Sequence, residues 1–290
     1  DDTYTPSWLR SNKMTKVTIG NNITRIGNYA FHRCYSLTSV TIPNSVTSIG
    51  EYAFQNCRDL TSVTIPNSVN TIGEYAFEYC ESMTSVTMGS GVTSIDQYAF
   101  SNCTGLTRVN ISDLSAWCNI DFGNLTSNPL NYAKYLYLDG VLVEDIIIPA
   151  DMTEVKPYVF ANCEKLKSVT MPDGVTSIGR YAFRGCSGLT NITIPDEVTS
   201  IGEYAFYVCT GLTSITIPDK VTSIGTYAFS NCTSLKEVYC KPIAPPVGAP
   251  SMFSINASGR QIYVPTDSVE AYQGASEWST YAKKIVGYNF

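Results

Sequence analysis

The sequence has few residues of the kinds that catalysis, metal binding and nucleic-acid binding require. Its 290 residues include one histidine, His32, and only 15% are charged. The 19 lysines and arginines do not cluster and the formal charge is -6, so the electrostatic footprint of a nucleic-acid-binding protein is missing. No apolar run approaches the roughly 18 residues of a membrane span, and no Cys-x-x-Cys pair gives zinc spacing. We therefore expect no nucleic-acid partner, no membrane span, no metal and no cofactor.

A catalytic role for His32 deserves the first test, because Cys34 lies two residues later. A thiol hydrolase needs a cysteine and a histidine brought together as nucleophile and base. The position of His32 is filled in other repeats by Gln55, Glu78, Ser101, Arg184, Tyr207 and Ser230. We interpret a position that accepts all these residue types as solvated surface. Since the acidic residues are also scattered, we expect the chain not to be an enzyme.

A 23-residue pattern fills most of the chain. One copy runs from Leu37 to Asp59. Copies begin at Leu60, Met83, Leu106, Leu166, Leu189 and Leu212. A fixed period of this length is typical of a solenoid, in which each coil is stabilised by its neighbours.

Each copy predicts the same local structure. The β-branched run 40–42 predicts a short strand with one buried face, and Pro43 ends it because proline has no N–H to donate. Gly50 marks a bend that need not demand a positive φ, since Asp96 and Lys156 stand at the equivalent positions. Residues 51–54 predict one helical turn that places an alanine and a phenylalanine inside. The predicted coil is thus strand, turn, second extended piece and helical turn.

Cysteine and tyrosine follow the same period. Eight of the ten cysteines recur with it, at Cys34, Cys57, Cys80, Cys103, Cys163, Cys186, Cys209 and Cys232. Equivalent positions in neighbouring coils have parallel Cβ vectors at strand spacing, too far apart for a disulfide, so we predict buried free thiols. Only Cys118 and Cys240 lie outside this row. The tyrosines are Tyr29, Tyr52, Tyr75, Tyr98, Tyr158, Tyr181, Tyr204 and Tyr227; we favour ring packing with exposed hydroxyls over the alternative of a glycan-binding row.

The breaks in the pattern divide the chain. We predict one solenoid over residues 1–290. Its parts are a truncated first coil at 1–14, repeats at 15–111, an insertion at 112–145, repeats at 146–241 and a C-terminal cap at 242–290. Trp8 is expected to occupy the phenylalanine position of the first coil. The insertion adds 14 residues; residues 127–133 predict a short helix, and Asp139-Gly140 between alternating apolar runs predicts a hairpin. Residues 268–284 predict a capping helix that begins at Ser268.

The first strand of each coil is expected to display Ser and Thr on the exposed face of the sheet. A few coils depart from this rule, and these departures are the candidate binding residues. They are Arg108, Asn110, Asp145, Ile147, Asn191, Glu237 and Tyr239. Two interpretations stay open: coils beside the insertion drift because it covers them, or a recognition patch forms where the insertion meets the sheet.

The repeat Leu-x-x-Val-x-Ile-Pro-x-x-Val-x-x-Ile-Gly-x-x-Ala-Phe-x-x-Cys-x-x resembles the BspA-like leucine-rich repeats over nearly the whole chain. The resemblance implies a curved solenoid with a parallel sheet on its concave side. With the short helical turns, the inserted hairpin and the helical cap predicted above, the expected fold is a β-rich solenoid. It also implies a non-catalytic protein-binding module at the cell surface or secreted, with host extracellular matrix or another microbe's surface as partner. The first residues, Asp-Asp-Thr-Tyr, lead us to expect that a targeting signal is missing. The alternatives are a structural spacer in a larger surface protein and glycan binding through the tyrosines.

Overall fold

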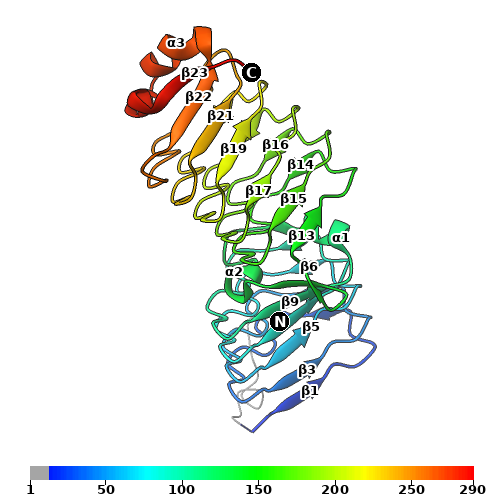
Figure 1. Ribbon diagram of the computed structural model, residues 1–290. Helices are drawn as coiled ribbons and strands as arrows, with labels where there is room; N and C mark the ends of the chain where they lie inside the picture. Colours follow the sequence, from blue (N-terminus) through cyan, green and yellow to red (C-terminus); the bar gives the residue numbers. More distant parts are fainter. Residues whose placement is uncertain (1–12) are drawn as a thin grey trace. The chain divides into compact units, whose positions relative to one another are not determined.

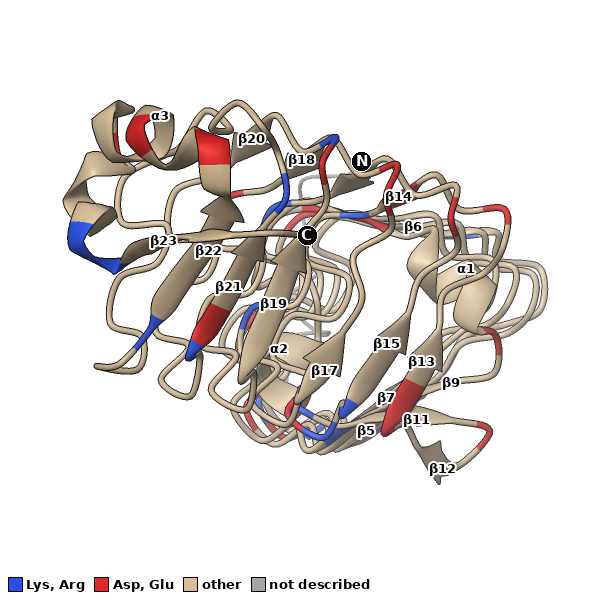
Figure 2. Cartoon of the chain, turned by 45° about the horizontal axis from the view of Figure 1, so that its top comes forward, with Lys and Arg blue, Asp and Glu red and all other residues tan. Residues whose placement is uncertain are grey.

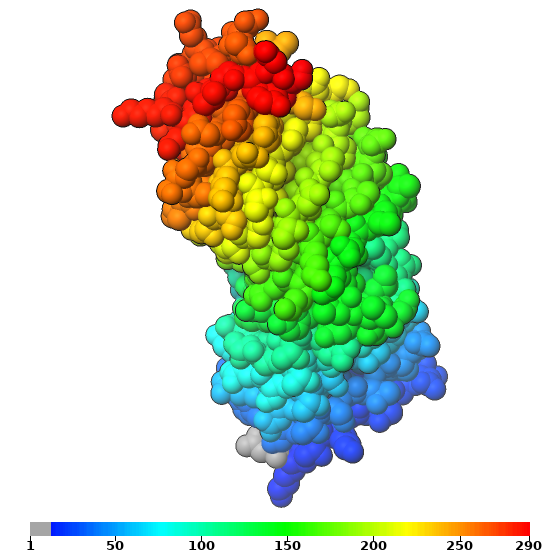
Figure 3. Space-filling model, viewed as in Figure 1, coloured from blue at the N-terminus to red at the C-terminus, as the bar shows by residue number. Residues whose placement is uncertain are grey.

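A computed structural model describes residues 13–290 of the chain. These residues form two compact units, the first ending at Val143 and the second beginning at Glu144. Within each unit the chain winds as successive coils of about 23 residues, which appear as ordered bands of colour in Figures 1 and 3. The expected position of Trp8 lies outside the described residues. The division of residues 1–290 into the parts of one solenoid stays a prediction.

In the first unit, two rows of parallel strands run along the stack of coils. The longer strands, which we call the front sheet, are β1 (Lys16–Thr18), β3 (Ser39–Thr41), β5 (Ser62–Thr64), β7 (Ser85–Met88) and β9 (Arg108–Ile111). The second row consists of β2 (Arg25–Ile26), β4 (Ser48–Ile49), β6 (Thr71–Ile72), β8 (Ser94–Ile95) and β10 (Asp121–Phe122). Paired residues are 23 apart, as in Ser62 with Ser85. The period read from the sequence is therefore the register of the sheets.

The second unit repeats this arrangement. Its front strands are β13 (Asp145–Ile147), β15 (Ser168–Thr170), β17 (Asn191–Ile192), β19 (Ser214–Ile217), β21 (Glu237–Cys240), β22 (Gln261–Pro265) and β23 (Ile285–Tyr288). Its second row is β14 (Glu154–Val155), β16 (Ser177–Ile178), β18 (Ser200–Ile201) and β20 (Ser223–Ile224). The last four front strands form one parallel sheet in the order β19-β21-β22-β23, which Figure 2 shows. Strand β23 extends the sheet beyond the strands that the sequence predicted.

The interior of each coil is apolar and repeats from coil to coil. Leu60, Phe77 and Cys80 are fully buried, and each phenylalanine stacks on the next, with ring centroids 5.2 Å apart between Phe54 and Phe77. The predicted free thiols are confirmed, because all ten cysteines are buried and unpaired by disulfides. Six of the periodic thiols donate to a phenylalanine carbonyl of the preceding coil, as Cys80 Sγ does to Phe54 O at 3.4 Å. The cysteines thus act as small apolar residues that also satisfy a buried backbone acceptor.

The corner after each second-row strand differs from the predicted helical turn. Consecutive four-residue turns form it instead, with Gln55 N–H donating to Tyr52 O and Cys57 N–H to Phe54 O. Tyr52 has a φ of 56° and Asn56 a φ of 61°, and this left-handed geometry breaks any helix. Gly50 keeps an ordinary φ, as predicted. A Cβ there would lie 2.7 Å from the backbone nitrogen of Asn28, so the glycine is required by the close approach of adjacent coils.

The insertion is one enlarged coil followed by a hairpin. Helix α1 (Leu114–Cys118), capped by the Asp113 carboxylate, replaces the usual turn, so that β10 pairs with β8 at 27 residues instead of 23. Helix α2 (Leu130–Ala133) confirms the predicted short helix. Strand β11 (Leu136–Leu138) then pairs in parallel with β9, and antiparallel with β12 (Val141–Leu142). Asp139 and Gly140 both have positive φ, as the predicted two-residue hairpin requires.

The α-helix of the C-terminal cap is shorter than predicted. Helix α3 (Val269–Gly274) ends where the buried Trp278 turns the chain into a 3₁₀ segment, Ser279–Lys284. Ser268 precedes α3, although its side chain makes no capping hydrogen bond. The Tyr272 hydroxyl donates to Pro242 O at 2.7 Å and Trp278 Nε1 donates to Pro246 O at 2.8 Å. These two aromatic residues attach the cap to the preceding proline-rich loop.

Candidate functional site

Two of the predicted site residues lie on β9 in the first unit, and the side chains of both contact neighbouring residues. The Arg108 guanidinium lies 4.1 Å above the ring centroid of Tyr137, which belongs to the inserted hairpin. Its Nε is buried and makes no hydrogen bond within the described residues. The Asn110 amide donates to Val86 O at 3.4 Å in the same sheet. These contacts support the interpretation that the coils beside the insertion adapt to it.

Two further predicted residues lie on β13, the first front strand of the second unit. The Asp145 carboxylate accepts a hydrogen bond from the Ser168 hydroxyl at 2.5 Å. The Ile147 side chain is 74% exposed, as single aliphatic side chains on protein surfaces often are. The predicted patch that combines these residues with Arg108 and Asn110 draws on both units and stays a prediction.

The remaining predicted residues, Asn191, Glu237 and Tyr239, lie on front strands of the second unit, and Tyr239 is part of an aromatic cluster. Tyr239 stacks on Tyr263 of the next strand with centroids 4.9 Å apart, and Tyr288 stands edge-on to both at 5.5 and 5.6 Å. Phe290 contacts Tyr288 at 5.1 Å. We call these four residues the front cluster. Tyr288 and Phe290 are 43% and 52% exposed, so the cluster offers aromatic surface to solvent.

A hollow lies beside the front cluster. Thr216, Tyr239, Lys241, Tyr288, Asn289 and Phe290 line this open hollow of about 490 Å³. It exists because Tyr239 pairs with Thr216 on the adjacent strand, and a threonine replaces the ring that would continue the stack. We call this place the ring step. It combines an aromatic wall with a small polar floor.

A second, more polar hollow of about 300 Å³ adjoins the ring step. Thr216 and Lys241 line both hollows, and the second also contacts Asn191, Asp196 and Ser214. The side chains of Asn191, Ser214 and Thr216 are exposed, and they form no hydrogen bond with any other described residue. Three predicted site residues, Asn191, Glu237 and Tyr239, thus come together around this region.

Charge is balanced around the front cluster. The Tyr239 hydroxyl donates to Glu237 Oε2 at 3.2 Å. Burial raises the pKa of Tyr239, and the neighbouring Glu237 carboxylate raises it further, so the phenol stays neutral at physiological pH. Lys241 brings one positive charge to the hollow, and Asp196 one negative charge to its polar part. The surface therefore has no strong preference for a ligand of either sign.

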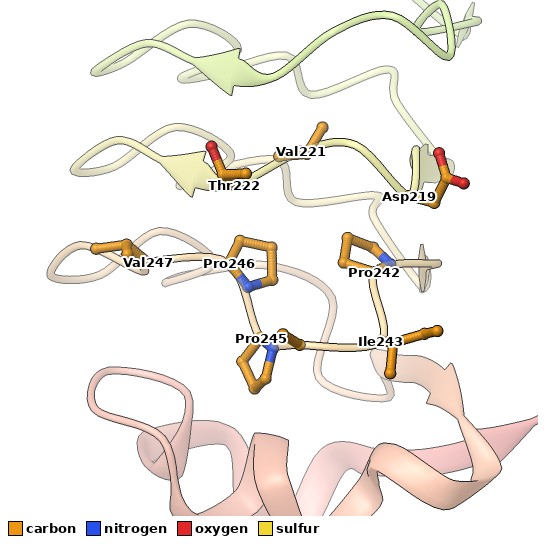
Figure 4. Close-up of a pocket in the computed structure, with 9 residues that line it drawn as sticks. Asp219, Val221, Thr222, Pro242, Ile243, Pro245, Pro246 and Val247 are labelled. Carbon is orange, nitrogen blue, oxygen red and sulfur yellow. The ribbon is translucent and has the colours of Figure 1, made fainter.

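A separate apolar hollow of about 390 Å³ lies along the proline-rich loop (Figure 4). Its lining comprises Asp219, Val221, Thr222 and residues 242–247. Pro246 points toward the coil that carries Val221, whereas Pro245 points to the other side. Ile243 is 80% exposed and Val247 is 74% exposed. This hollow has few polar groups with which to orient a ligand.

The row of tyrosines packs on itself, which supports the favoured interpretation. Ring centroids are 4.7 Å apart between Tyr29 and Tyr52, and 4.9 Å between Tyr52 and Tyr75, with nearly parallel planes. A sugar ring stacks on an aromatic face, and the inner rings of this row have both faces covered. The geometry therefore gives no support to glycan binding along the row.

The described residues place His32 against a tyrosine and bring together no cluster of metal-ligating side chains. His32 packs edge-on against Tyr29, with centroids 5.6 Å apart. The interpretation of its repeat position as solvated is wrong, since the equivalent Glu78, Ser101 and Ser230 are buried and Gln55 Nε2 donates to Glu78 Oε2 at 2.5 Å. No group of three His, Cys, Asp or Glu residues within 13–290 could hold a metal ion. The same residues contain no helix long and apolar enough to cross a membrane.

Sequence comparison identifies the family. A family model described as BspA type leucine rich repeat region matches residues 6–126 and 133–244, in 6 copies. The chain belongs to the BspA-type leucine-rich repeat family, as the repeat motif indicated. No curated protein matches the chain significantly.

Solved structures of bacterial proteins share the fold. A leucine-rich cell surface protein from Faecalibacterium prausnitzii is 26% identical with a TM-score of 0.53, over 92% of this chain and 81% of that one. The pneumococcal vaccine antigen PcpA is 19% identical with a TM-score of 0.56, over 95% of this chain and 78% of that one. The second likeness concerns the fold alone.

Sequence reasoning missed most of the residues at the candidate site. Lys241, Tyr263, Tyr288 and Phe290 line it or build its wall, and none was predicted. Tyr263 could have been found, because it alternates with buried residues in a predicted strand that pairs with the strand of Tyr239. Tyr288 lies in β23, which follows the cap and pairs with β22 at an offset of 23 residues. Its segment has none of the leucine, proline and cysteine residues of the repeat motif, so the motif does not reveal it.

Proposed function

We propose that this chain is a non-catalytic protein-binding module of a cell-surface or secreted protein, and that the front sheet of the second unit contacts the partner. The observation that carries the proposal is the front cluster, where Tyr239 stands opposite Thr216 of the neighbouring strand and where Tyr288 and Phe290 add exposed aromatic surface. Tyrosine and phenylalanine are enriched in protein interfaces, whereas Ser/Thr rows contribute little binding energy. The surface relative from F. prausnitzii supports the same setting.

The absence of a catalytic centre is part of the proposal. The leucine-rich repeat fold supports recognition surfaces, and the single histidine of this chain packs against Tyr29. Host extracellular-matrix proteins and surface proteins of other microbes are the partner classes we propose. Balanced charge around Glu237 and Lys241 favours a contact that depends weakly on salt.

Surface plasmon resonance against a panel of purified extracellular-matrix proteins tests the proposal. We expect Tyr288→Ala and Tyr239→Ala to weaken binding to any positive partner by about tenfold or more. Thr41→Ala, on the front sheet of the first unit, is the matched control and should leave affinity unchanged. Arg108→Ala tests the patch beside the insertion in the same assay. A partner whose affinity none of these aromatic variants alters binds elsewhere, and the assignment of the front cluster would be wrong.

A structural spacer is the second candidate function. The coils of each unit are nearly identical in register, as in the pairs of β4 with β6 and β6 with β8, which is suited to a rigid support. A spacer has no reason to expose an aromatic cluster, so the two candidates separate on the same binding assay. The spacer would be favoured if no matrix or microbial surface protein bound to the chain.

A further inference from the structure

The ring step on the front sheet has the geometry of a binding site for a ring-shaped ligand. Tyr239 and Tyr263 stack at 4.9 Å, close to the ~4.8 Å that separates neighbouring strands. On the next strand the paired residue is Thr216, so the third ring position of the stack holds only a small side chain. The hollow of about 490 Å³ occupies that position. The face of Tyr239 on the Thr216 side is therefore open for a ligand ring.

The groups around this open face are polar. Thr216 offers a hydroxyl, Lys241 an ammonium group and Asn289 an amide at the hollow, and the adjoining hollow adds Asn191, Asp196 and Ser214. The hydroxyls of Ser214 and Thr216 and the amide of Asn191 can each donate and accept. None of these three side chains appears in a hydrogen bond within the described part of the chain. The ring step therefore has unused hydrogen-bonding capacity on the rim of an aromatic wall.

We infer that the ring step is a saccharide-binding subsite, which shares Tyr239 with the proposed protein-binding surface. A pyranose ring has C–H bonds on its faces and hydroxyl groups around its rim. The faces suit the electron-rich face of Tyr239, and the hydroxyls suit the surrounding Thr, Asn, Asp and Lys side chains. An aromatic side chain of a protein would fit the same space, but it would cover these polar groups without pairing them, at a cost in free energy.

The size and charge of the region indicate the kind of saccharide. The hollow at the ring step and its polar neighbour share Thr216 and Lys241, so a ligand can extend from one into the other. Volumes of about 490 and 300 Å³ fall in the range of small-ligand sites and suit a short oligosaccharide. Since Lys241 and Asp196 carry opposite charges, an uncharged chain of hexose or N-acetylhexosamine units fits best. The inner rings of the periodic tyrosine row, with both faces covered, offer no such place.

A glycan array followed by calorimetric titration of the strongest hits against the full chain tests the inference. Thr216→Tyr is the decisive variant, because its ring continues the stack and fills the site without removing any wall residue. We expect this variant and Tyr239→Ala each to weaken saccharide binding about tenfold or more. Tyr239→Phe, which keeps the ring and loses the bond to Glu237, should change affinity less than about twofold. Thr170→Tyr, the same substitution in an equivalent position on β15, is the matched control and should bind normally.

The outcomes separate this inference from the proposed protein-binding function. An array without hits, or hits whose affinity Thr216→Tyr leaves unchanged, overturns the saccharide subsite and leaves protein binding untouched. A tyrosine- or tryptophan-containing peptide that binds the step while no saccharide does would also overturn it. Saccharide binding that Thr216→Tyr and Tyr239→Ala abolish and Thr170→Tyr retains establishes the subsite, even when every matrix protein fails to bind.

Discussion

Two rows of stacked tyrosines in this protein have the same ring spacing and different surroundings. In the periodic row, Tyr204 lies 4.8 Å from Tyr181 and 5.0 Å from Tyr227, so both of its faces are covered. In the front cluster, Tyr239 stacks on one neighbour at 4.9 Å and meets Thr216 on its other side. A continuous stack is a structural element, and a stack that stops exposes a face. The location of the break therefore decides whether tyrosines stabilise the fold or form a site.

The backbone makes the same distinction. Tyr204 has a φ of 54° and lies in a tight corner, whereas Tyr239 lies in an extended strand of the front sheet. The left-handed conformation costs about 1 kcal/mol or more for a residue with a Cβ, and ring stacking offsets that cost. The periodic tyrosines therefore stabilise the corners that they occupy. Tyr239, by contrast, stands at a strand position that other coils fill with threonine.

The largest expected effect is the loss of stability at alkaline pH, which the buried thiols beneath the tyrosines cause. Burial raises the pKa of Cys232 and of Cys240 to about 12, and raises that of Cys209 well above its usual value. The neutral thiol is favoured in the folded state, so this stability is complete below about pH 8.5 and is lost as pH rises toward the folded pKa. Each such thiol lowers the free energy of unfolding by about 1.4 kcal/mol per pH unit in that window.

Circular dichroism melts between pH 7 and 11 measure this loss. We expect the melting temperature to be flat to about pH 8.5 and to fall steeply above it. Cys232→Ala removes one titrating thiol and should give a shallower fall. Equal slopes in the two proteins would mean that tyrosine ionisation, and not the thiol row, drives alkaline unfolding.

The next effect concerns the buried phenylalanines that stack beneath the periodic tyrosines. Phe206 is fully buried between Phe183 and Phe229, with centroids 5.4 and 5.1 Å away. Phe206→Ala should lower the free energy of unfolding by about 3–5 kcal/mol, because it leaves a cavity in a stack that cannot close. Urea denaturation measures it. Phe206→Leu retains most of the volume and should cost clearly less, and the reverse order would contradict a packed row.

Replacing one tyrosine of each row tests the comparison directly. Tyr204→Ala removes two stacking contacts and should cost about 1–3 kcal/mol. Tyr239→Ala removes one stacked and one edge contact at an exposed site, and should cost about 1 kcal/mol or less. Differential scanning calorimetry measures both. A larger loss for Tyr239→Ala would show that the front cluster is a structural cap and would weaken its assignment as a binding site.

The smallest expected effect is the contribution of backbone strain at Tyr204 to the free energy of unfolding. Tyr204→Gly and Tyr204→Ala both lose the ring, but only glycine adopts a φ of 54° without strain. The glycine variant should therefore be more stable than the alanine variant by about 1 kcal/mol. The same pair at Tyr239, in a strand, should show the opposite order, since glycine destabilises an extended segment. Thermal melts of the four variants decide the point.

The solenoid could be predicted from the sequence because the period of the chain is the register of its sheets. The hairpin at Asp139-Gly140 followed from turn chemistry alone. The corners were mispredicted as helical because local propensity does not reveal that coil-to-coil bonds, such as Tyr52 N–H to Glu74 O, hold tyrosine in a left-handed conformation. The four extra residues of the enlarged coil are absorbed by α1, and only the pairing of β10 with β8 locates them.

The candidate site could be predicted in part. Glu237, Tyr239 and Asn191 stood out because each breaks a repeated position, and the structure places them around adjoining hollows. Tyr288 and Phe290 come from the segment after the cap, whose strand β23 keeps the 23-residue offset to β22 but has none of the leucine, proline and cysteine residues of the repeat motif. A comparison of repeats reveals departures only in the segments that the motif identifies.

The bonds between coils have a consequence for how such a chain can change in length. Tyr52 N–H donates to Glu74 O, and Tyr29 N–H donates to Glu51 O, so each coil offers its neighbour the acceptors that it itself uses. Removing residues 60–82 joins Asp59 to Met83 in phase and leaves every such bond a partner of the same kind. Recombination between repeats can therefore lengthen or shorten the protein by whole coils without a penalty at the junction. The number of coils can therefore vary under selection without any change to the residues of the front cluster.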